Sequence, residues 1–258
     1  MAEFEASGGA EQNLAGRVVL VTGGAKRVGA AIARRLHGAG AKVVLHYRAA
    51  AAEAQALAAE LEALRPDSVA CLQADLLLTA ALPGLVTAVL ERFGRLDGLV
   101  NNASSFYPTP VGGIDEAAWD DLVGSNFKAP LFLTQAAAPH LRAVRGAVVN
   151  ITDIHAERPL PGYPLYCAAK GALLTLTRAL AAELAPEVRV NAVAPGPILW
   201  PEGKGFDPAA RQAIVADTLL KREGAPEDIA GAVHFLLAGA PYVTGQVINV
   251  DGGRTAHL

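Results

Sequence analysis

Short apolar runs alternate along the chain with longer segments in which apolar and polar positions are mixed. The runs are rich in β-branched residues and contain few polar positions, a pattern typical of strands that are buried on both faces. They predict strands at residues 17–22, 41–47, 68–74, 98–103, 146–152, 187–195 and 245–253.

The mixed segments between these runs repeat their apolar positions with helical spacing. They predict helices at residues 26–39, 49–64, 79–93, 114–142, 163–185, 208–219 and 226–238. Alternating strands and helices predict a single α/β domain, a Rossmann-type doubly wound fold with a seven-stranded parallel sheet and helices on both faces. We assign this domain to residues 16–258 and a flexible N-terminal tail to residues 1–15, which lack the pattern of a signal peptide.

Composition removes several classes of function. The 258 residues carry a net charge of −3 and form no basic stripe, which argues against a nucleic-acid partner. No apolar run reaches the roughly 18 residues that a membrane helix needs. Only Cys71 and Cys167 are present, which favours a reducing, cytoplasmic location, and no cluster of ligands has metal spacing, so we expect no metal.

A glycine-rich turn, Thr22 to Gly29, joins the first predicted strand to the first helix. Such a turn lets backbone N–H groups and the helix dipole approach a pyrophosphate. The second strand ends in His46, Tyr47 and Arg48 with no acid before Glu53. Because an acid would repel a 2′-phosphate and arginine would bind it, we expect NADPH as the cofactor. The alternative is that Arg48 is only a solvated residue at a helix start.

Tyr166 and Lys170 are four residues apart on a predicted helix and therefore share one face. A nearby ammonium favours the phenolate, so we expect Lys170 to lower the pKa of Tyr166 and make it a proton donor. Asp153 lies thirteen residues upstream of Tyr166. An ionised carboxylate cannot donate a hydrogen bond to a developing alkoxide, so Asp153 favours a substrate with a C=N bond and an N–H group over a ketone. Alternatively, Asp153 pairs with Lys170 or caps a turn.

Four stretches of the chain, TGGAKRVG, HYR, NNASSFYPTP and the spacing Asp-x12-Tyr-x3-Lys, resemble the short-chain dehydrogenases/reductases and, within them, the pteridine reductases. The resemblance spans almost the whole chain. It departs from the common family pattern where Arg27 replaces a glycine and where Asp153 replaces a serine. It implies that Tyr166 is the acid/base, that Lys170 holds the nicotinamide ribose, and that Phe106 stacks on the pterin.

The expected site follows from this resemblance together with the residues themselves. The expected catalytic residues are Asp153, Tyr166 and Lys170. The expected cofactor-binding residues are Gly23, Lys26, Arg27, Val28, His46, Tyr47, Arg48, Asp75, Leu76, Asn102, Ala103, Ser104, Tyr166, Lys170, Pro195, Gly196 and Ile198. The expected substrate-binding residues are Ser104, Phe106, Asp153, Tyr166 and Trp200. Asn126 and Asn150 fall where the family has a relay and a structural asparagine, and the Pro/Gly-rich segment 195–208 is a candidate lid.

We therefore predict NADPH-dependent reduction of a pterin, from the dihydropteridine to the tetrahydropteridine, with dihydrofolate as a candidate substrate. One alternative is a carbonyl reductase of the same family, for example a 3-oxoacyl-thioester reductase. Another alternative, of a different class, is a non-catalytic NADPH-binding sensor, although the intact Tyr166 and Lys170 pair speaks against it. The resemblance also implies a homotetramer.

Overall fold

A parallel sheet forms the centre of the molecule. The computed structural model of the protein describes residues 13–200 and 206–256. In these residues the seven strands are β1 (Val18–Val21), β2 (Lys42–Tyr47), β3 (Val69–Gln73), β4 (Gly98–Asn101), β5 (Ala147–Ile151), β6 (Arg189–Pro195) and β7 (Val247–Val250). They pair in the order β3-β2-β1-β4-β5-β6-β7, and every pair is parallel. The predicted doubly wound sheet is confirmed, and its strand order reverses between β1 and β4, where such folds bind ligands.

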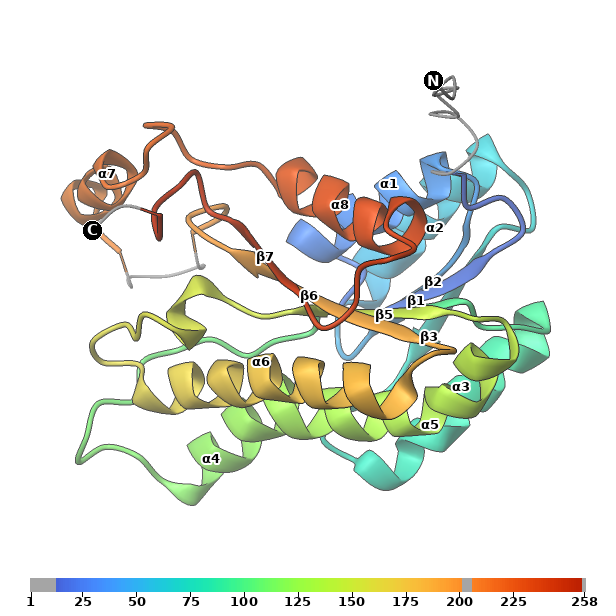
Figure 1. The fold of residues 1–258 in the computed structure, drawn as a ribbon, viewed down its shortest axis with the longest axis horizontal. Coiled ribbons are helices and arrows are strands. Elements are labelled where there is room, and N and C mark those ends of the chain that lie inside the picture. Colours follow the sequence, from blue (N-terminus) through green and yellow to red (C-terminus); the bar gives the residue numbers. More distant parts are fainter. Residues whose placement is uncertain (1–12, 201–205, 257–258) are drawn as a thin grey trace, which may run out of the picture.

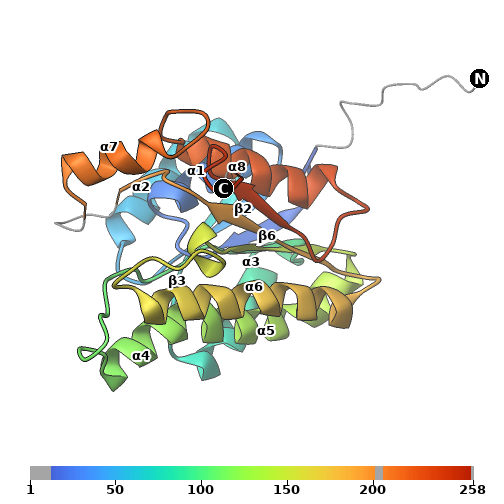
Figure 2. The same ribbon diagram turned by 60° about the vertical axis from the view of Figure 1, so that its left-hand side comes forward.

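Helices cover both faces of this sheet (Figures 1 and 2). Their bounds are α1 (Arg27–Gly38), α2 (Ala51–Leu64), α3 (Leu82–Phe93), α4 (Glu116–Val123), α5 (Ala129–Ala143), α6 (Pro164–Leu184), α7 (Pro208–Ala216) and α8 (Pro226–His234). Helices α1, α2 and α8 lie on one face, and α3, α5 and α6 lie on the other. The predicted helix 114–142 is divided into α4 and α5 by one wide π-helical turn, Gly124–Lys128.

Alternate residues of the central strands enter two separate cores. Val18 and Leu20 of β1 pack with residues of α3, α5 and α6, whereas Val19 and Val21 pack with residues of α1 and α8. All four side chains are essentially inaccessible to solvent. This two-sided burial explains why the strands appear in the sequence as uninterrupted apolar runs.

The predicted tail, residues 1–15, lies mostly outside the described residues, as does part of the segment 195–208. Leu14 is buried in the core, and its N–H donates a 2.8 Å hydrogen bond to the carbonyl oxygen of Ala39. Within the described ranges, none of the helices combines the length and the apolar character needed to cross a bilayer.

All parallel strands end at the same edge of the sheet. Figure 1 shows α4 and α7 beyond this edge, on opposite sides of it, and the last described residues of the chain reach the same end of the molecule. Side chains that follow different strands are therefore brought together here, although they are far apart in the sequence.

Candidate active site

A cavity of about 670 Å³ lies at the carboxyl ends of the strands. Of the residues expected at the site, all except Tyr47 line this one cavity. Residues outside the expected catalytic, cofactor-binding and substrate-binding sets also line it, namely Gly29, Leu77, Ser105, Ser125, Ile151, Thr152, Ile154, His155, Leu160, Pro197, Leu199, Phe206, Ile214 and Arg254. The expected residues are thus largely brought together by the fold.

The glycine turn between β1 and α1 is packed too closely for other side chains. Gly23 has a φ of 60°, and a Cβ built on Gly29 would lie 2.1 Å from the Gly23 carbonyl oxygen. The Asn102 side-chain amide donates to the carbonyl oxygens of Thr22 and Gly23 at 2.9 and 3.1 Å. The turn therefore presents bare backbone to the cavity, which suits the close approach of a pyrophosphate.

His46, on β2, stabilises the same turn by hydrogen bonding. Its Nδ1 accepts a hydrogen bond from the Gly23 N–H at 3.2 Å, and its Nε2 lies 3.1 Å from the carbonyl oxygen of Ala74. These contacts assign the proton to Nε2. Burial lowers the pKa of His46, so the imidazole is held neutral. Both ring nitrogens are engaged by the protein, and His46 fixes the shape of the turn.

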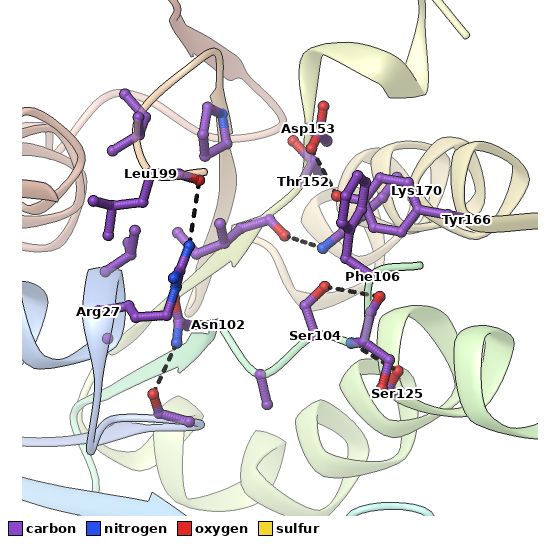
Figure 3. Close-up of a pocket in the computed structure, with 18 of the residues that line it drawn as sticks. Arg27, Asn102, Ser104, Phe106, Ser125, Thr152, Asp153, Tyr166, Lys170 and Leu199 are labelled. Atoms are coloured by element: carbon purple, nitrogen blue, oxygen red, sulfur yellow. Dashed lines mark hydrogen bonds between the residues drawn. The ribbon is translucent and has the colours of Figure 1, made fainter. Parts of the chain in front are cut away.

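Arg27 lies on the wall of the cavity opposite Tyr166 and Phe106 (Figure 3). Its backbone is left-handed, with a φ of 52°, where a glycine would be unstrained. Its Nη2 donates to the carbonyl oxygens of Leu199 and Trp200 at 3.3 and 3.0 Å. Arg27 therefore connects the glycine turn to the segment that follows β6.

Two further cations line the cavity near the end of β2. Lys26 forms a 2.5 Å ion pair with Glu53, and Arg48 lies 3.9 Å from Asp121. The Arg48 side chain is 59% exposed, so this loose pair leaves its guanidinium open to a further anionic partner.

Asp153 and Tyr166 are joined directly. The Tyr166 hydroxyl donates a 2.6 Å hydrogen bond to Asp153 Oδ2, while Asp153 Oδ1 accepts from the His155 N–H at 2.8 Å. Asp153 follows β5 and begins a short 3-10 turn, and Tyr166 lies in the first turn of α6. The turn-capping role considered as an alternative is therefore real, and it coexists with the contact to Tyr166.

The expected lowering of the Tyr166 pKa is wrong for this arrangement. Burial and the adjacent Asp153 carboxylate raise the pKa of Tyr166 well above its ordinary value. Only 4% of Tyr166 is exposed, and its hydroxyl contacts the Asp153 carboxylate directly at 2.6 Å, whereas the Lys170 nitrogen lies 5.8 Å from the ring centroid. Tyr166 is thus held as a phenol with its proton directed at Asp153.

Lys170 is buried below Tyr166, one turn further along α6. Its Nζ donates a 2.8 Å hydrogen bond to the carbonyl oxygen of Ile151, at the end of β5. Burial lowers the pKa of Lys170 to about 8, although the Asp153 carboxylate acts in the opposite direction. Tyr166, Lys170 and Asp153 therefore form one electrostatically coupled group.

Phe106 is fixed by two tyrosine rings. Tyr163 stacks on Phe106 with a centroid distance of 4.7 Å and an interplanar angle of 15°, and Tyr166 meets it edge-on, also at 4.7 Å. Tyr163 is not among the residues that the sequence predicts for the site, although it shortly precedes Tyr166. Its position three residues earlier, at the start of the same helix, could have indicated a shared pocket.

Ser104 is supported by the wide turn between α4 and α5. Its hydroxyl donates to Asn126 Oδ1 at 2.7 Å, and Asn126 Nδ2 in turn donates to the carbonyl oxygens of Ser105 and Leu122 at 2.9 and 3.0 Å. π-helical turns are frequent at functional sites because they redirect side chains. Here the turn places a buried amide beneath the expected substrate-binding serine.

A second amide network anchors α6 to the sheet. Asn101 at the end of β4 donates to Asn150 Oδ1 at 2.8 Å, and Asn150 donates to Thr177 Oγ1 on α6 at 2.9 Å. All three residues are buried. Since buried polar groups that lose their partners are costly, this network fixes the helix that carries Tyr166 and Lys170.

The fold and the site together define a nucleotide-binding oxidoreductase, and the chain belongs to the short-chain dehydrogenase/reductase family. A family model described as enoyl-(acyl carrier protein) reductase matches residues 23–255. Pteridine reductase 1 of Leishmania tarentolae is 40% identical over 92% of this chain and 95% of its own length. A 3-oxoacyl-(acyl-carrier-protein) reductase of Staphylococcus aureus is 34% identical over 91% of this chain and 96% of its own length.

Solved structures agree with this assignment. A structure described as a short-chain alcohol dehydrogenase from Sinorhizobium meliloti 1021 superposes with a TM-score of 0.91 at 34% identity, covering 96% of this chain and all of that one. A blue fluorescent protein from a metagenomic library, in complex with NADPH, superposes with a TM-score of 0.88 at 36% identity, covering 94% of this chain and 99% of that one. The predicted family and fold are therefore confirmed.

Proposed function

We propose that this protein is an NADPH-dependent reductase of pterins that converts a dihydropteridine to a tetrahydropteridine. The observation that carries the proposal is the 2.6 Å hydrogen bond between Tyr166 and Asp153, because a carboxylate next to the proton donor suits a substrate that gains a proton on nitrogen. The similarity to a relative named as a pteridine reductase supports it.

The residues of the cavity fit NADPH. The bare glycine turn with Arg27 would hold the pyrophosphate, and Arg48 would bind the 2′-phosphate. Asp75 would accept from the adenine amine, and Lys170 would hold the nicotinamide ribose. When bound, NADPH supplies the hydride that reduces a carbon of the substrate ring.

Tyr166 and Asp153 would manage the accompanying proton. Reducing a C=N bond adds hydride to carbon and a proton to nitrogen, so the site must deliver one proton for each turnover. The raised pKa of Tyr166 keeps the proton on its phenol, within reach of Asp153. After this proton passes to the ring nitrogen, either directly or through Asp153, the Lys170 ammonium would stabilise the negative charge that is left.

Phe106 and Ser104 would seat the flat ring. One face of Phe106 is covered by Tyr163, which sets the plane of the aromatic ring. A heterocycle lying against Phe106 would gain stacking, and the hydroxyl of Ser104, held by Asn126, would orient its polar edge.

The second candidate is a carbonyl reductase acting on 3-oxoacyl thioesters. The observation in its favour is the similarity to the Staphylococcus aureus relative, which covers nearly as much of the chain at 34% identity. Asp153 argues against this function because its carboxylate would repel a developing alkoxide.

The proposal also includes a homotetramer in the cytoplasm. Trp119 on α4 and Phe132 on α5 are 52% and 37% exposed, which provides apolar surface for a partner copy. Both cysteines are free thiols, which fits a reducing compartment. Sedimentation velocity would test the oligomeric state, and a monomer at micromolar concentration would contradict it.

The first experiment measures NADPH oxidation with dihydrobiopterin, dihydrofolate, an oxidised pterin and an acetoacetyl thioester, with NADH as the control cofactor. We expect the highest kcat/KM with a dihydropterin and NADPH. A higher kcat/KM for the thioester would favour the carbonyl reductase, and tight NADPH binding without any turnover would favour a non-catalytic sensor.

Replacing Asp153 tests the observation that carries the proposal. Asp153→Ser should lower kcat for pterin reduction by about 10² or more and raise activity on ketones, because a hydroxyl can donate to an alkoxide. Asp153→Asn is the matched control, since it preserves the shape of the side chain but cannot carry the proton. It should lose pterin reduction without gaining ketone activity. Pterin turnover equal to that of the wild type in both variants would remove Asp153 from the mechanism.

A further inference from the structure

More positively charged than negatively charged side chains line the cavity. Among the described lining residues the cations are Lys26, Arg27, Arg48, Lys170 and Arg254, and the carboxylates are Asp75 and Asp153. Such an excess of cations favours anionic ligands and draws them in. Two groups on NADPH, the pyrophosphate and the 2′-phosphate, account for part of the excess, because the proposed site places them near Arg27 and Arg48.

Arg254 differs from the other cations of the cavity. The other four each contact an acceptor of the protein: Lys26 contacts Glu53, Arg27 the carbonyls of Leu199 and Trp200, Arg48 Asp121, and Lys170 the carbonyl of Ile151. The Arg254 guanidinium forms no hydrogen bond or ion pair within residues 13–200 and 206–256, although the residue is half-buried. A partly desolvated cation without a partner is unfavourable unless a ligand supplies the missing anion.

Arg254 also lies away from the cofactor phosphates. It follows β7 at one edge of the sheet, whereas Arg48 follows β2, and β1, β4, β5 and β6 separate the two strands. At about 4.8 Å between neighbouring strands, the ends of β2 and β7 are roughly 24 Å apart. The glycine turn follows β1 and Asp153 follows β5, so Arg254 lies beyond the reacting residues, on the side away from the phosphate-binding turn.

The backbone that carries Arg254 is firmly held. The Asp251 carboxylate accepts from the N–H groups of Gly253 and Thr255 at 2.9 and 2.8 Å, and from the Thr255 hydroxyl at 2.7 Å. Arg158, on the loop that follows Asp153, donates to the Thr255 carbonyl oxygen at 2.7 Å. The backbone at Arg254 is thus coupled to the loop of Asp153, which limits the positions that the side chain can reach and reduces the entropy lost when a ligand binds.

We propose that Arg254 is a specificity-determining residue that binds a carboxylate on the side chain of the substrate, outside the ring that is reduced. The inference rests on the proposed function and deepens it: the substrate class is a pterin with an anionic tail, such as the glutamate of a folate. With the ring seated on Phe106 between Tyr166 and the cofactor, a tail that extends toward β7 would reach the guanidinium. A bidentate arginine–carboxylate pair would then select for the charged tail.

The test compares two dihydropterins that differ in tail charge. Dihydrofolate carries glutamate carboxylates, and dihydrobiopterin carries a neutral side chain. Arg254→Gln should raise KM for dihydrofolate about tenfold or more, with kcat within about twofold, and should leave KM for dihydrobiopterin unchanged. Arg254→Lys should retain most of the dihydrofolate affinity, because it keeps the charge. Equal changes for both substrates, or no change for dihydrofolate, would overturn the proposal.

A second pair of probes separates this inference from the proposed function. Acetoacetyl-coenzyme A carries phosphates, and the N-acetylcysteamine thioester of acetoacetate is uncharged. If pterins are not turned over and Arg254→Gln weakens only the coenzyme A thioester, the pterin function and the carboxylate tail are both overturned. If pterins are turned over and Arg254→Gln affects only dihydrofolate, both proposals are supported. Pterin turnover with no selective effect of Arg254→Gln overturns the Arg254 proposal alone.

Discussion

Burial strongly affects the ionisation of the Lys170 side chain. Only 2% of the residue is exposed, and burial lowers its pKa to about 8. Its ammonium is retained because it donates to the Ile151 carbonyl oxygen and faces a carboxylate at Asp153. Burial also raises the pKa of Tyr166. The pKa values of the two neighbours are therefore shifted in opposite directions, and each shift favours the neutral form of the side chain.

This shift predicts a pH-dependent stability. Between pH about 8 and the ordinary lysine pKa of about 10.4, Lys170 binds a proton only in the unfolded chain, so the free energy of unfolding rises with pH in this window. Relative to Lys170→Met, the wild type should gain up to about 1.4 kcal/mol per pH unit. Urea unfolding at pH 8, 9 and 10 measures the difference. A wild type that loses stability relative to Lys170→Met in this range would refute the assignment.

At the scale of elements, the backbone of the glycine turn between β1 and α1 is tightly constrained. The turn depends on Gly29, whose missing side chain leaves room for the Gly23 carbonyl, while His46 and Asn102 hold the backbone from neighbouring strands. The geometry of the phosphate-binding turn is therefore fixed by β2 and β4 as much as by its own sequence.

Gly29→Ala should disrupt the glycine turn between β1 and α1. Its Cβ would lie 2.1 Å from the Gly23 carbonyl oxygen and 2.7 Å from Asn102 Nδ2, so the turn must move. We expect a loss of about 1–3 kcal/mol in the free energy of unfolding and at least a tenfold weaker NADPH affinity, measured by urea unfolding and by fluorescence titration. Gly38→Ala, at the end of the same helix with no atom within 4 Å of the added methyl, should leave NADPH affinity unchanged. Unimpaired cofactor binding by Gly29→Ala would contradict this view of the turn.

The sequence predicted the elements well because their signals are local. Each buried strand and amphipathic helix carries its own period, and the glycine turn and the spacing of Tyr166 and Lys170 lie within short segments. A search for apolar positions with a period of 3.6 does not detect the wide turn at Gly124–Lys128, so α4 and α5 were predicted as one helix.

The pKa of Tyr166 was predicted in the wrong direction because it depends on which charge lies nearest, and only the folded chain determines that distance. Arg254 went unnoticed because its lack of a partner is a property of the whole cavity.

At the scale of the whole molecule, the sheet spreads the cations of the cavity over its width. Arg48 lies beyond β2 and Arg254 beyond β7, with the reacting residues between them. Because the protein as a whole carries a net charge of −3, this concentration of positive charge is specific to the cavity. The cations of the cavity would attract an anionic cofactor and substrate, although the negative net charge of the whole protein repels them weakly.

Removing Arg48 should reduce the preference for NADPH. Arg48→Ala should raise KM for NADPH about tenfold and leave KM for NADH unchanged, since only NADPH carries the 2′-phosphate. Arg34→Ala removes the same charge from an exposed pair with Glu60 outside the cavity, and it should alter neither constant. Steady-state kinetics with both cofactors decide the matter, and an equal loss with NADH would show that Arg48 does not recognise the phosphate.

The wide turn between α4 and α5 has a consequence for how this chain tolerates changes in length. A π-helical turn holds one residue more than an α-helical turn, so deleting a single residue within Gly124–Lys128 would restore a regular helix without breaking it. Because the extra residue is absorbed within the turn, α4 and α5 would keep nearly the same faces toward each other, and the change would fall on the side chains of the turn itself. Asn126 accepts from the Ser104 hydroxyl at 2.7 Å and donates to the Ser105 carbonyl oxygen at 2.9 Å, so its displacement would remove this support from the loop that carries Phe106. A deletion that regularises this helix would therefore be more damaging to the site than many substitutions in its walls.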